Sequence, residues 1–132
     1  MIVLDASTVI DFLLTLPPCA DVITERIRSE APEVAAPHLI DAEVGQVLRR
    51  FVRAGQLDAV RAKQAIEDLL AMPIVRYPHG PLLQRAFELR ENATVYDALY
   101  LALAEALDAP LITRDGALDT VPGCRAQVEA LS

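Results

Sequence analysis

The stretch TVYDALYLALAEAL, residues 94 to 107, decides the fold. Almost all of it is Ala, Leu or Tyr, which predicts a helix that is buried on most of its surface. The apolar run Pro-Leu-Ile-Thr at 110–113 follows closely and predicts a buried strand. A buried helix that leads into a buried strand is typical of α/β proteins. Asp97 lies near the start of this apolar helix, where a carboxylate either caps the helix or belongs to a functional site.

Short apolar runs and segments with helical spacing alternate along the whole chain. The predicted strands are residues 2–4, 34–36, 73–77 and 110–113, with a last edge strand at 125–128. The predicted helices are residues 7–14, 18–29, 38–54, 58–70, 81–90 and 94–107. Strands separated by helices pair in parallel. The predicted fold is therefore α/β, a three-layer α/β/α sandwich around a central, mostly parallel sheet, in a single domain of residues 1–132.

Two details of the helices follow from single residues. Ser7 and Asp58 are the predicted N-caps of the helices that they begin, because such side chains accept hydrogen bonds from free backbone N–H groups. The apolar side chains of the 58–70 helix are expected to face the core. These side chains are Val60, Ile66, Leu69 and Leu70.

The composition is that of a globular protein with one core. The chain has 132 residues, of which 53% are hydrophobic, and a mean hydropathy of +0.30. No apolar run is long enough to span a bilayer, and the N-terminus lacks the basic start and longer apolar stretch of a signal peptide. The expected location is the cytoplasm, without membrane association.

The charge and the cysteines restrict the possible functions. The net charge of −7 disfavours general polyanion binding, so a nucleic-acid function requires local basic patches or metal ions. Arg49, Arg50 and Arg53 form one such cluster, which either holds phosphates or is a solvated helix face. Cys19 and Cys124 are far apart and form no zinc-binding motif, so a zinc site is not expected.

Four acidic residues stand at strand ends or near helix starts in the predicted α/β units. Asp5 directly follows the first strand, and Asp115 follows the fourth. Glu43 lies in the first turns of the helix after the second strand, and Asp97 in the first turn of the helix that leads to the fourth. Ligands bind at the carboxyl ends of parallel strands. The four side chains are therefore expected to converge at one edge of the sheet.

Each acid also has an ordinary explanation. Thr94 and Asp97 have the spacing of a capping box, in which Asp97 only stabilises the helix start. Asp5 can form an Asx-turn and Asp115 a plain turn. Glu43 can simply face water. A cap explains one residue, however, whereas a shared site explains four.

Together the four acids indicate a metal site. Carboxylates that border apolar segments are costly unless they are paired or bound to a cation, and Arg114 is the only basic residue adjacent to one of them. Several like charges in one place favour a divalent ion, and oxygen ligands select Mg²⁺ or Mn²⁺. Such an ion polarises a phosphodiester and activates water.

Polar residues beside these acids have two interpretations each. The hydroxyls of Ser7 and Thr113 can orient the carboxylates. Alternatively, Ser7 is a helix cap and Thr113 an ordinary strand residue. Asp11 and Asp119 are expected to be solvated, although Asp119 is a candidate to help hold a second ion.

Four segments resemble one known family. They are DASTVID at 5–11, Glu43 in a helix after Ala-Pro, YDALYLALA at 96–104 and PLITRD at 110–115. In order and spacing they resemble a PIN domain, specifically the VapC toxins of type II toxin–antitoxin systems. The similarity covers essentially the whole chain. The third and fourth segments together are quite specific, whereas the N-terminal D-x-S alone is weak.

The resemblance implies a Mg²⁺- or Mn²⁺-dependent endoribonuclease. Asp5, Glu43, Asp97 and Asp115 match the acidic tetrad of the family, and Asp5 and Asp97 match its most direct metal ligands. Family members cleave structured cellular RNA, often tRNA or rRNA, and thereby stop translation. Hydrolysis is expected to leave a 5′-phosphate and a 3′-hydroxyl.

The resemblance also implies partners. A cognate VapB-type antitoxin lays an apolar C-terminal segment over the toxin and inserts a basic side chain at the metal site, and the toxin forms a homodimer or a toxin–antitoxin hetero-oligomer. The candidate contacts in this chain are otherwise core residues. They are Phe12, Leu13, Leu14, Leu16 and the helix at 59–70.

Three rival interpretations are weaker. Phosphatases of the haloacid dehalogenase type have a second Asp two residues after the first, where this chain has Ser7. A response-regulator receiver needs a Lys after a late strand, but the only lysine, Lys63, lies in mid-helix. A catalytically silent PIN-like protein-binding module needs at least one acid replaced, and none is. A metal titration distinguishes this last alternative, because a pure binding module has no carboxylate-dependent Mn²⁺ site.

Overall fold

The computed structural model describes all residues, 1–132, and contains one sheet of five parallel strands in the order β3-β2-β1-β4-β5. The strands are β1 (Ile2–Leu4), β2 (Val34–Pro37), β3 (Ile74–Tyr77), β4 (Leu111–Thr113) and β5 (Val128–Ala130). The strand expected at 125–128 therefore lies slightly later in the chain. The predicted α/β fold with a central parallel sheet is confirmed.

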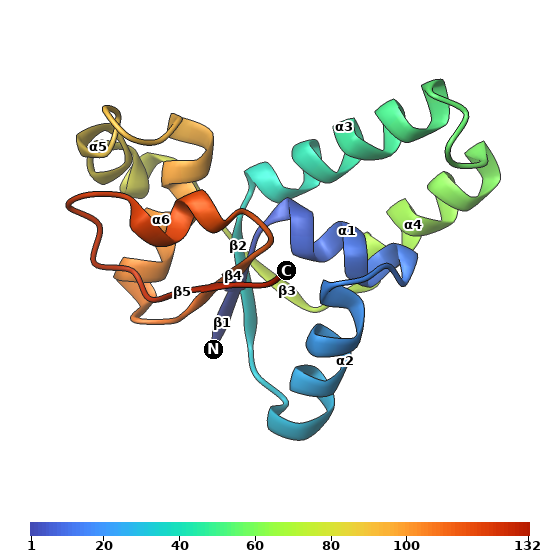
Figure 1. Cartoon of the computed structure of the whole chain (residues 1–132), viewed down its shortest axis with the longest axis horizontal. Coiled ribbons are helices and arrows are strands. Elements are labelled where there is room, and N and C mark those ends of the chain that lie inside the picture. Colours follow the sequence, from blue (N-terminus) through green and yellow to red (C-terminus); the bar gives the residue numbers. More distant parts are fainter.

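Six helices cover the sheet in two layers. They are α1 (Ala6–Leu14), α2 (Cys19–Glu30), α3 (Leu39–Arg53), α4 (Ala59–Ala71), α5 (Gly80–Glu88) and α6 (Val95–Leu107), with a 3₁₀ helix, η1, at Gly116–Thr120. Helices α5 and α6 lie on one face of the sheet and α1 and α2 on the other (Figure 1). Helices α3 and α4 form a hairpin that packs against α1 and extends beyond the sheet.

The apolar helix α6 is the central element of its layer. Seven consecutive residues, Ala98 to Ala104, are buried. The helix lies between α5 and strands β1, β2 and β4, so apolar contact is available around its whole circumference. Strand β1, in the middle of the sheet, is likewise completely buried. A helix that is apolar all round is stable only in such a position.

The orientation predicted for the 58–70 helix is wrong at three positions. Val60 is 76% exposed, Leu70 67% and Ile66 39%. Only Leu69 of the predicted set is buried, together with two alanines of α4. Helix α4 is the outer arm of a hairpin, so it packs through one narrow face, and no further layer covers the other side.

The helix caps confirm two predictions and correct one. Thr94 caps α6 and Asp58 caps α4, each by accepting a backbone N–H. Ser7 does not cap α1. The cap is Asp5, whose carboxylate accepts the N–H of Thr8 at 3.1 Å. Asp5 is the only residue between β1 and α1, so the acid at the strand end is itself in the capping position.

None of the helices is individually long and apolar enough to cross a membrane. The pair α1 and α2 has the required length and composition only when it is taken together across a bend of 89°.

Candidate active site

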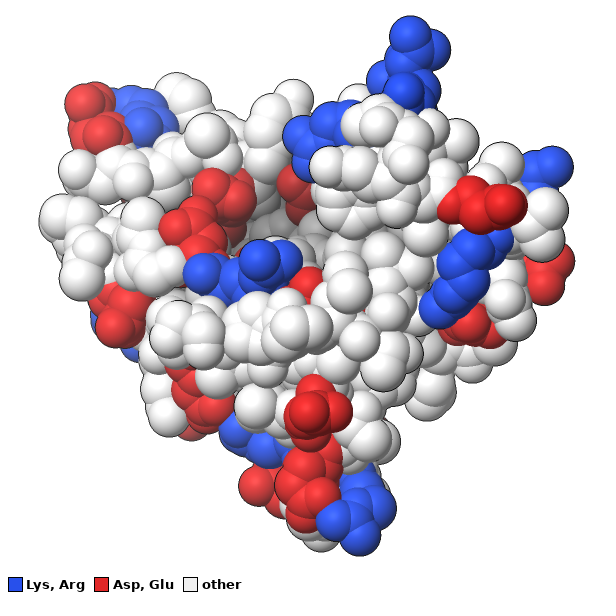
Figure 2. Space-filling model, turned by 45° about the vertical axis from the view of Figure 1, so that its right-hand side comes forward, with Lys and Arg blue, Asp and Glu red and all other residues white.

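The structure brings all four predicted acids to the same end of the sheet. Asp5 follows β1, and Asp115 follows the neighbouring strand β4. Glu43 is in the second turn of α3, which follows β2, and Asp97 is in the first turn of α6. Strands β2, β1 and β4 are adjacent and parallel, so these positions share one edge. Figure 2 shows acidic side chains gathered around a hollow, with a basic group across its rim.

Asp5 is held by more hydrogen bonds than any other acid of this cluster. It is only 9% exposed. Its carboxylate accepts from the hydroxyl of Ser7 at 2.6 Å and from both the N–H and the hydroxyl of Thr8 at 3.1 and 3.3 Å. The hydroxyl of Thr113 donates to its other oxygen. Four donors fix the position of the carboxylate.

Thr113 joins two of the acids. Besides donating to Asp5, its hydroxyl accepts the backbone N–H of Asp115 at 3.0 Å. Ser7 has a similar double role, because its hydroxyl donates to Asp5 and accepts the N–H of Arg114 at 3.1 Å. The two hydroxyls singled out in the sequence therefore both contact Asp5 and tie it to the segment that follows β4.

Glu43 has a partner that the sequence did not reveal. The hydroxyl of Tyr100, a residue only 2% exposed, donates to it at 2.6 Å. Burial and the neighbouring carboxylate raise the pKa of Tyr100 well above its usual range. The sequence could have predicted that a partner exists, because the hydroxyl of a tyrosine inside an apolar helix needs a hydrogen bond. Which partner it finds depends on α3 meeting α6.

The acids act on each other electrostatically. Burial raises the pKa of Glu43, and the charges of Asp97 and Asp5 raise it further, while the hydrogen bond from Tyr100 opposes this. Burial likewise raises the pKa of Asp97, and the charges of Asp115 and Asp5 add to the effect, against a hydrogen bond with Thr94. Glu43 and Asp97 are therefore partly desolvated and lie within electrostatic reach of the other acids.

Asp115 is the exposed member of the cluster. It caps η1 by accepting the N–H of Ala117 at 3.0 Å. The turn-forming explanation of this residue is therefore realised, and the residue still lies at the same edge as the other acids. A carboxylate in this position is accessible to a ligand that enters from solvent.

Asp11 was expected to be solvated, and this prediction is wrong. The residue is completely buried. Its carboxylate accepts from the guanidinium of Arg114 at 3.1 Å and from the N–H of Cys19 at 3.3 Å. Since Arg114 immediately precedes Asp115, this ion pair anchors the segment after β4 to α1. Burial and Asp11 together raise the pKa of the Cys19 thiol to about 12, so this cysteine is not a reactive thiolate. Asp119 is exposed, as expected.

The residues at this edge fit a hard divalent cation by chemistry. Their donor atoms are carboxylate and hydroxyl oxygens, which suit Mg²⁺ or Mn²⁺ rather than zinc. Burial is the main cause of the raised pKa values of Glu43 and Asp97, and the negative charge of the neighbouring carboxylates adds to it. As the side chains stand, no three Asp, Glu, His or Cys residues are close enough to hold one ion together. The carboxylates thus share a common edge but do not form a closed coordination shell.

Known proteins resemble this chain in sequence and in fold. Residues 2–123 match the PIN domain family. Ribonuclease VapC1 of Mycobacterium tuberculosis is 41% identical over 128 residues, which cover 96% of this chain and 95% of that protein. Ribonuclease VapC12 of the same organism is 39% identical over 132 residues, the full length of both. A chain in the crystal structure of VapBC2 from Rickettsia felis, bound to a promoter DNA fragment, aligns over the full length of both chains with a TM-score of 0.71 and 16% identity.

Proposed function

The chain belongs to the PIN domain family and, within it, to the VapC ribonucleases, and on this premise we propose a Mg²⁺- or Mn²⁺-dependent endoribonuclease that is the toxin of a type II toxin–antitoxin system. The observation that carries the metal dependence is the gathering of four carboxylates from four remote segments at one edge of the sheet. Their mutual effect on the pKa values of Glu43 and Asp97 supports it. A shared cation relieves this repulsion.

In this proposal Asp5 and Asp97 are the most direct ligands, and Glu43 and Asp115 complete the set. The chemistry that a divalent ion would supply when held by these residues is polarisation of the scissile phosphate and activation of water. Asp5 is already oriented by its four donors, and Tyr100 fixes one oxygen of Glu43. The substrate is cellular RNA, tRNA or rRNA, and hydrolysis leaves a 5′-phosphate and a 3′-hydroxyl.

The partner is a cognate VapB-type antitoxin, in a toxin–antitoxin hetero-oligomer or with a homodimer of the toxin. A groove of about 380 Å³ between α1 and the hairpin supports this, because Leu14, Leu16, Phe51 and Leu57 make most of its lining. Arg61 also lines it, and its buried Nη1 has no hydrogen-bond partner. The carbonyl groups of a bound peptide would supply one.

Other candidate contacts divide into two groups. Leu13 is buried and Phe12 half-buried against the core, so these two serve packing. Leu70 and Val60 of α4 are exposed and remain free to meet the antitoxin. We also propose that residues 1–132 form a single PIN-like domain, supported by one continuous core cluster, and that the protein acts in the cytoplasm, where its proposed substrates are.

RNA cleavage with matched acid variants tests the proposal. Purified protein is incubated with cellular RNA in Mg²⁺ or Mn²⁺, and the ends of the products are sequenced. Asp5→Asn and Asp97→Asn are expected to abolish cleavage and to keep the fold. Asp108→Asn is the control, because this acid lies at the opposite end of α6 in a left-handed conformation that Asn also adopts.

Calorimetric titration with Mn²⁺ separates the enzyme from the silent binding module. The parent is expected to bind Mn²⁺, and Asp5→Asn and Asp97→Asn to bind it at least tenfold more weakly, on the order of the effect of removing an interaction at a metal site. Unchanged cleavage in either variant, or no carboxylate-dependent Mn²⁺ binding in the parent, contradicts the proposal.

A further inference from the structure

The basic side chains of this protein are partnered very unevenly. Of the 12 Lys and Arg residues, seven form ion pairs. These are Arg26, Arg28, Arg76, Arg85, Arg90, Arg114 and Arg125. An eighth, Arg61, donates to the carbonyl of Leu13 in α1. The remaining four have neither kind of partner, and all four lie on the α3–α4 hairpin. They are Arg49, Arg50, Arg53 and Lys63, here named the hairpin cations.

Simple solvation of a helix face accounts poorly for the hairpin cations. Helix-surface charges stabilise when opposite signs are three or four residues apart, and like charges at that spacing destabilise. Arg49 and Arg53 are four apart and Arg50 and Arg53 three apart, and no acid occupies the corresponding positions around them. From residue 44 to residue 57 there is no acid, whereas Lys63 on α4 has Glu67 four residues later without forming an ion pair with it. This protein of net charge −7 therefore concentrates positive charge on the C-terminal half of α3, which holds three arginines and no acid.

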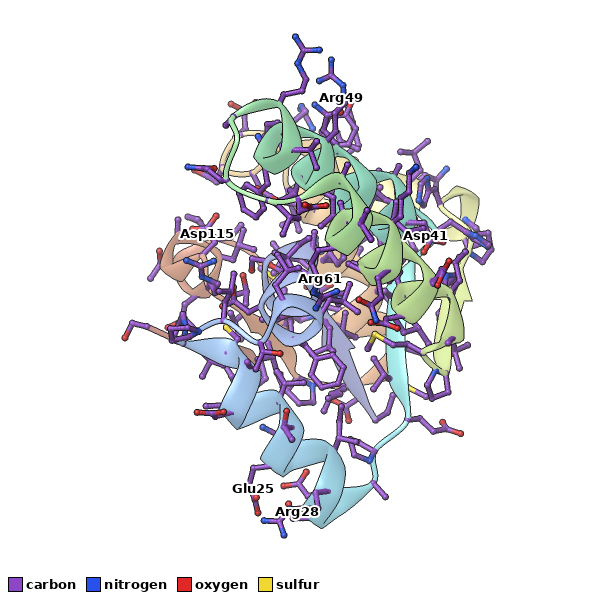
Figure 3. All side chains as sticks on the ribbon, turned by 90° about the vertical axis from the view of Figure 1, so that its right-hand side faces the viewer. Glu25, Arg28, Asp41, Arg49, Arg61 and Asp115 are labelled. Carbon is purple, nitrogen blue, oxygen red and sulfur yellow. The ribbon has the colours of Figure 1, made fainter.

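The position of the three arginines relative to Glu43 is set by a single helix, α3. Glu43 lies near the start of α3, and Arg50, seven residues later, lies on the same side of the helix two turns further on. At 1.5 Å per residue the arginines are about 10 to 15 Å along the axis from Glu43. This length corresponds to roughly three to four stacked nucleotides of one strand. Figure 3 shows Arg49 at the outer end of α3, pointing away from the sheet, whereas Arg61 lies between α4 and α1.

Three of the hairpin cations also share a groove. Arg49, Arg53 and Lys63 line a space of about 390 Å³ between α3 and α4. Its other lining residues are mainly apolar, among them Val52 and Ile66. Charged groups at the rim of an apolar groove suit a polymeric ligand that has both charged and apolar portions. Phosphates on a sugar–base backbone have this character, and arginine binds them with two parallel hydrogen bonds.

We propose that the hairpin cations bind backbone phosphates of the RNA whose scissile bond lies at the acidic edge of the sheet. This inference rests on the proposed function. It adds to it the surface over which the bound RNA strand extends away from the acids. Carboxylates around the scissile phosphate repel RNA, so an acidic ribonuclease needs positive charge a few nucleotides away. The hairpin cations are the only Lys and Arg side chains that no group of the protein itself engages.

Salt-dependent binding of RNA tests this proposal. All proteins carry Asp5→Asn so that the RNA stays intact, and the probe is a fluorescein-labelled single-stranded RNA of about 20 nucleotides, long enough to reach from the acids to the hairpin at about 3.4 Å per nucleotide. The test variant is Arg49→Gln/Arg50→Gln/Arg53→Gln. The control is Arg28→Gln/Arg90→Gln/Arg125→Gln, which removes the same charge from three arginines that are exposed but ion-paired.

The test variant is expected to bind the RNA at least tenfold more weakly at low salt. The slope of log affinity against log salt is expected to fall by about 0.7 for each phosphate that the variant no longer binds. The control is expected to keep the parent's slope. Thermal melts of both variants verify that they are folded.

Two outcomes overturn the inference. Equal losses in the test variant and the control mean that only net charge matters. If the test variant binds labelled polyglutamate more weakly than the parent but binds RNA equally well, the surface binds an acidic polypeptide instead. Cleavage by the chain without Asp5→Asn is measured separately. If that protein cleaves RNA while the test variant binds normally, this inference alone fails. If it cleaves no RNA, the proposed function fails.

Discussion

Helices α1 and α6 each begin with an acid of the site, but the two acids are used differently. At the start of α1, Asp5 is itself the N-cap and accepts four hydrogen bonds. At the start of α6, Thr94 is the cap, and its hydroxyl accepts the N–H of Asp97 at 3.1 Å. The carboxylate of Asp97 is half-buried, and burial and neighbouring charge raise its pKa.

This difference shows two ways in which an acidic residue near a helix start can contribute to stability and to the site. Asp5 couples the two, because the same oxygens that would hold an ion also satisfy the helix start. At α6 the two tasks are divided between Thr94 and Asp97. Variants at the two helix starts should therefore affect activity and stability in different combinations.

Alanine at either acid should produce the largest effect. For both Asp5→Ala and Asp97→Ala we expect RNA cleavage to slow by more than about 100-fold, beyond the loss typical of residues that only orient a ligand. Asp5→Ala should also reduce the free energy of unfolding by about 1–2 kcal/mol, because the cap is lost. Single-turnover cleavage and urea unfolding measure the two quantities. Comparable destabilisation by Asp97→Ala would remove the distinction between the helices.

Thr113→Val should have the next largest effect, because the hydroxyl contacts Asp5 and the N–H of Asp115. We expect cleavage to slow by about 10–100-fold and Mn²⁺ affinity to weaken in parallel. Thr113→Ser keeps the hydroxyl and should recover most of the activity. Equal losses in the Val and Ser variants would indicate that packing in β4 matters rather than the hydrogen bonds.

Tyr100→Phe tests the partner of Glu43, the acid on α3. Loss of the 2.6 Å hydrogen bond should weaken Mn²⁺ binding by about tenfold, because Glu43 is then less well oriented. Tyr96→Phe is the matched control on the same helix, since that side chain is 62% exposed and should change nothing. Isothermal titration with Mn²⁺ measures both. Identical behaviour of the two variants would exclude a positioning role for Tyr100.

Thr94→Ala should show the opposite pattern to Asp97→Ala, with a loss of stability and little loss of activity. We expect it to reduce the free energy of unfolding by about 1 kcal/mol, as for loss of a cap, and to change cleavage by less than about twofold. Thr94→Ser should retain the cap. A large loss of cleavage in Thr94→Ala with little loss of stability would mean that Thr94 belongs to the site.

The smallest effect concerns pH. The pKa values of Glu43 and Asp97 are raised in the folded state, so the fold favours their protonated forms. Their contribution to stability is present below the ordinary carboxyl pKa and is lost as pH rises through the raised values. In metal-free buffer, Asp97→Asn should lose less stability than the parent between about pH 4 and 7. The difference should be below about 1 kcal/mol, because half-buried charges are screened. Urea unfolding across this range measures it, and a larger loss in the variant would contradict the assignment.

The sequence predicted the parallel α/β arrangement and the edge on which the acids meet. This succeeded because a strand end is a local property, and parallel strands place all such ends together. Thr94 was also predictable as a cap, since capping depends on neighbours within one turn. The orientation of α4 was not, because its apolar side chains outnumber the surface available to bury them. Asp11 looked like an ordinary polar helix residue until Arg114, 103 positions later, was placed beside it.

The sequence alone therefore determined the elements, their parallel pairing and the four acids, because these depend on periodicity and on residues next to one another. Only the tertiary structure decided which oxygens are held and by what. Thr113 reaches Asp5 across 108 positions and Tyr100 reaches Glu43 across 57. The first contact depends on the pairing of β1 with β4 and the second on where α3 meets α6, and no local pattern in the chain encodes either arrangement.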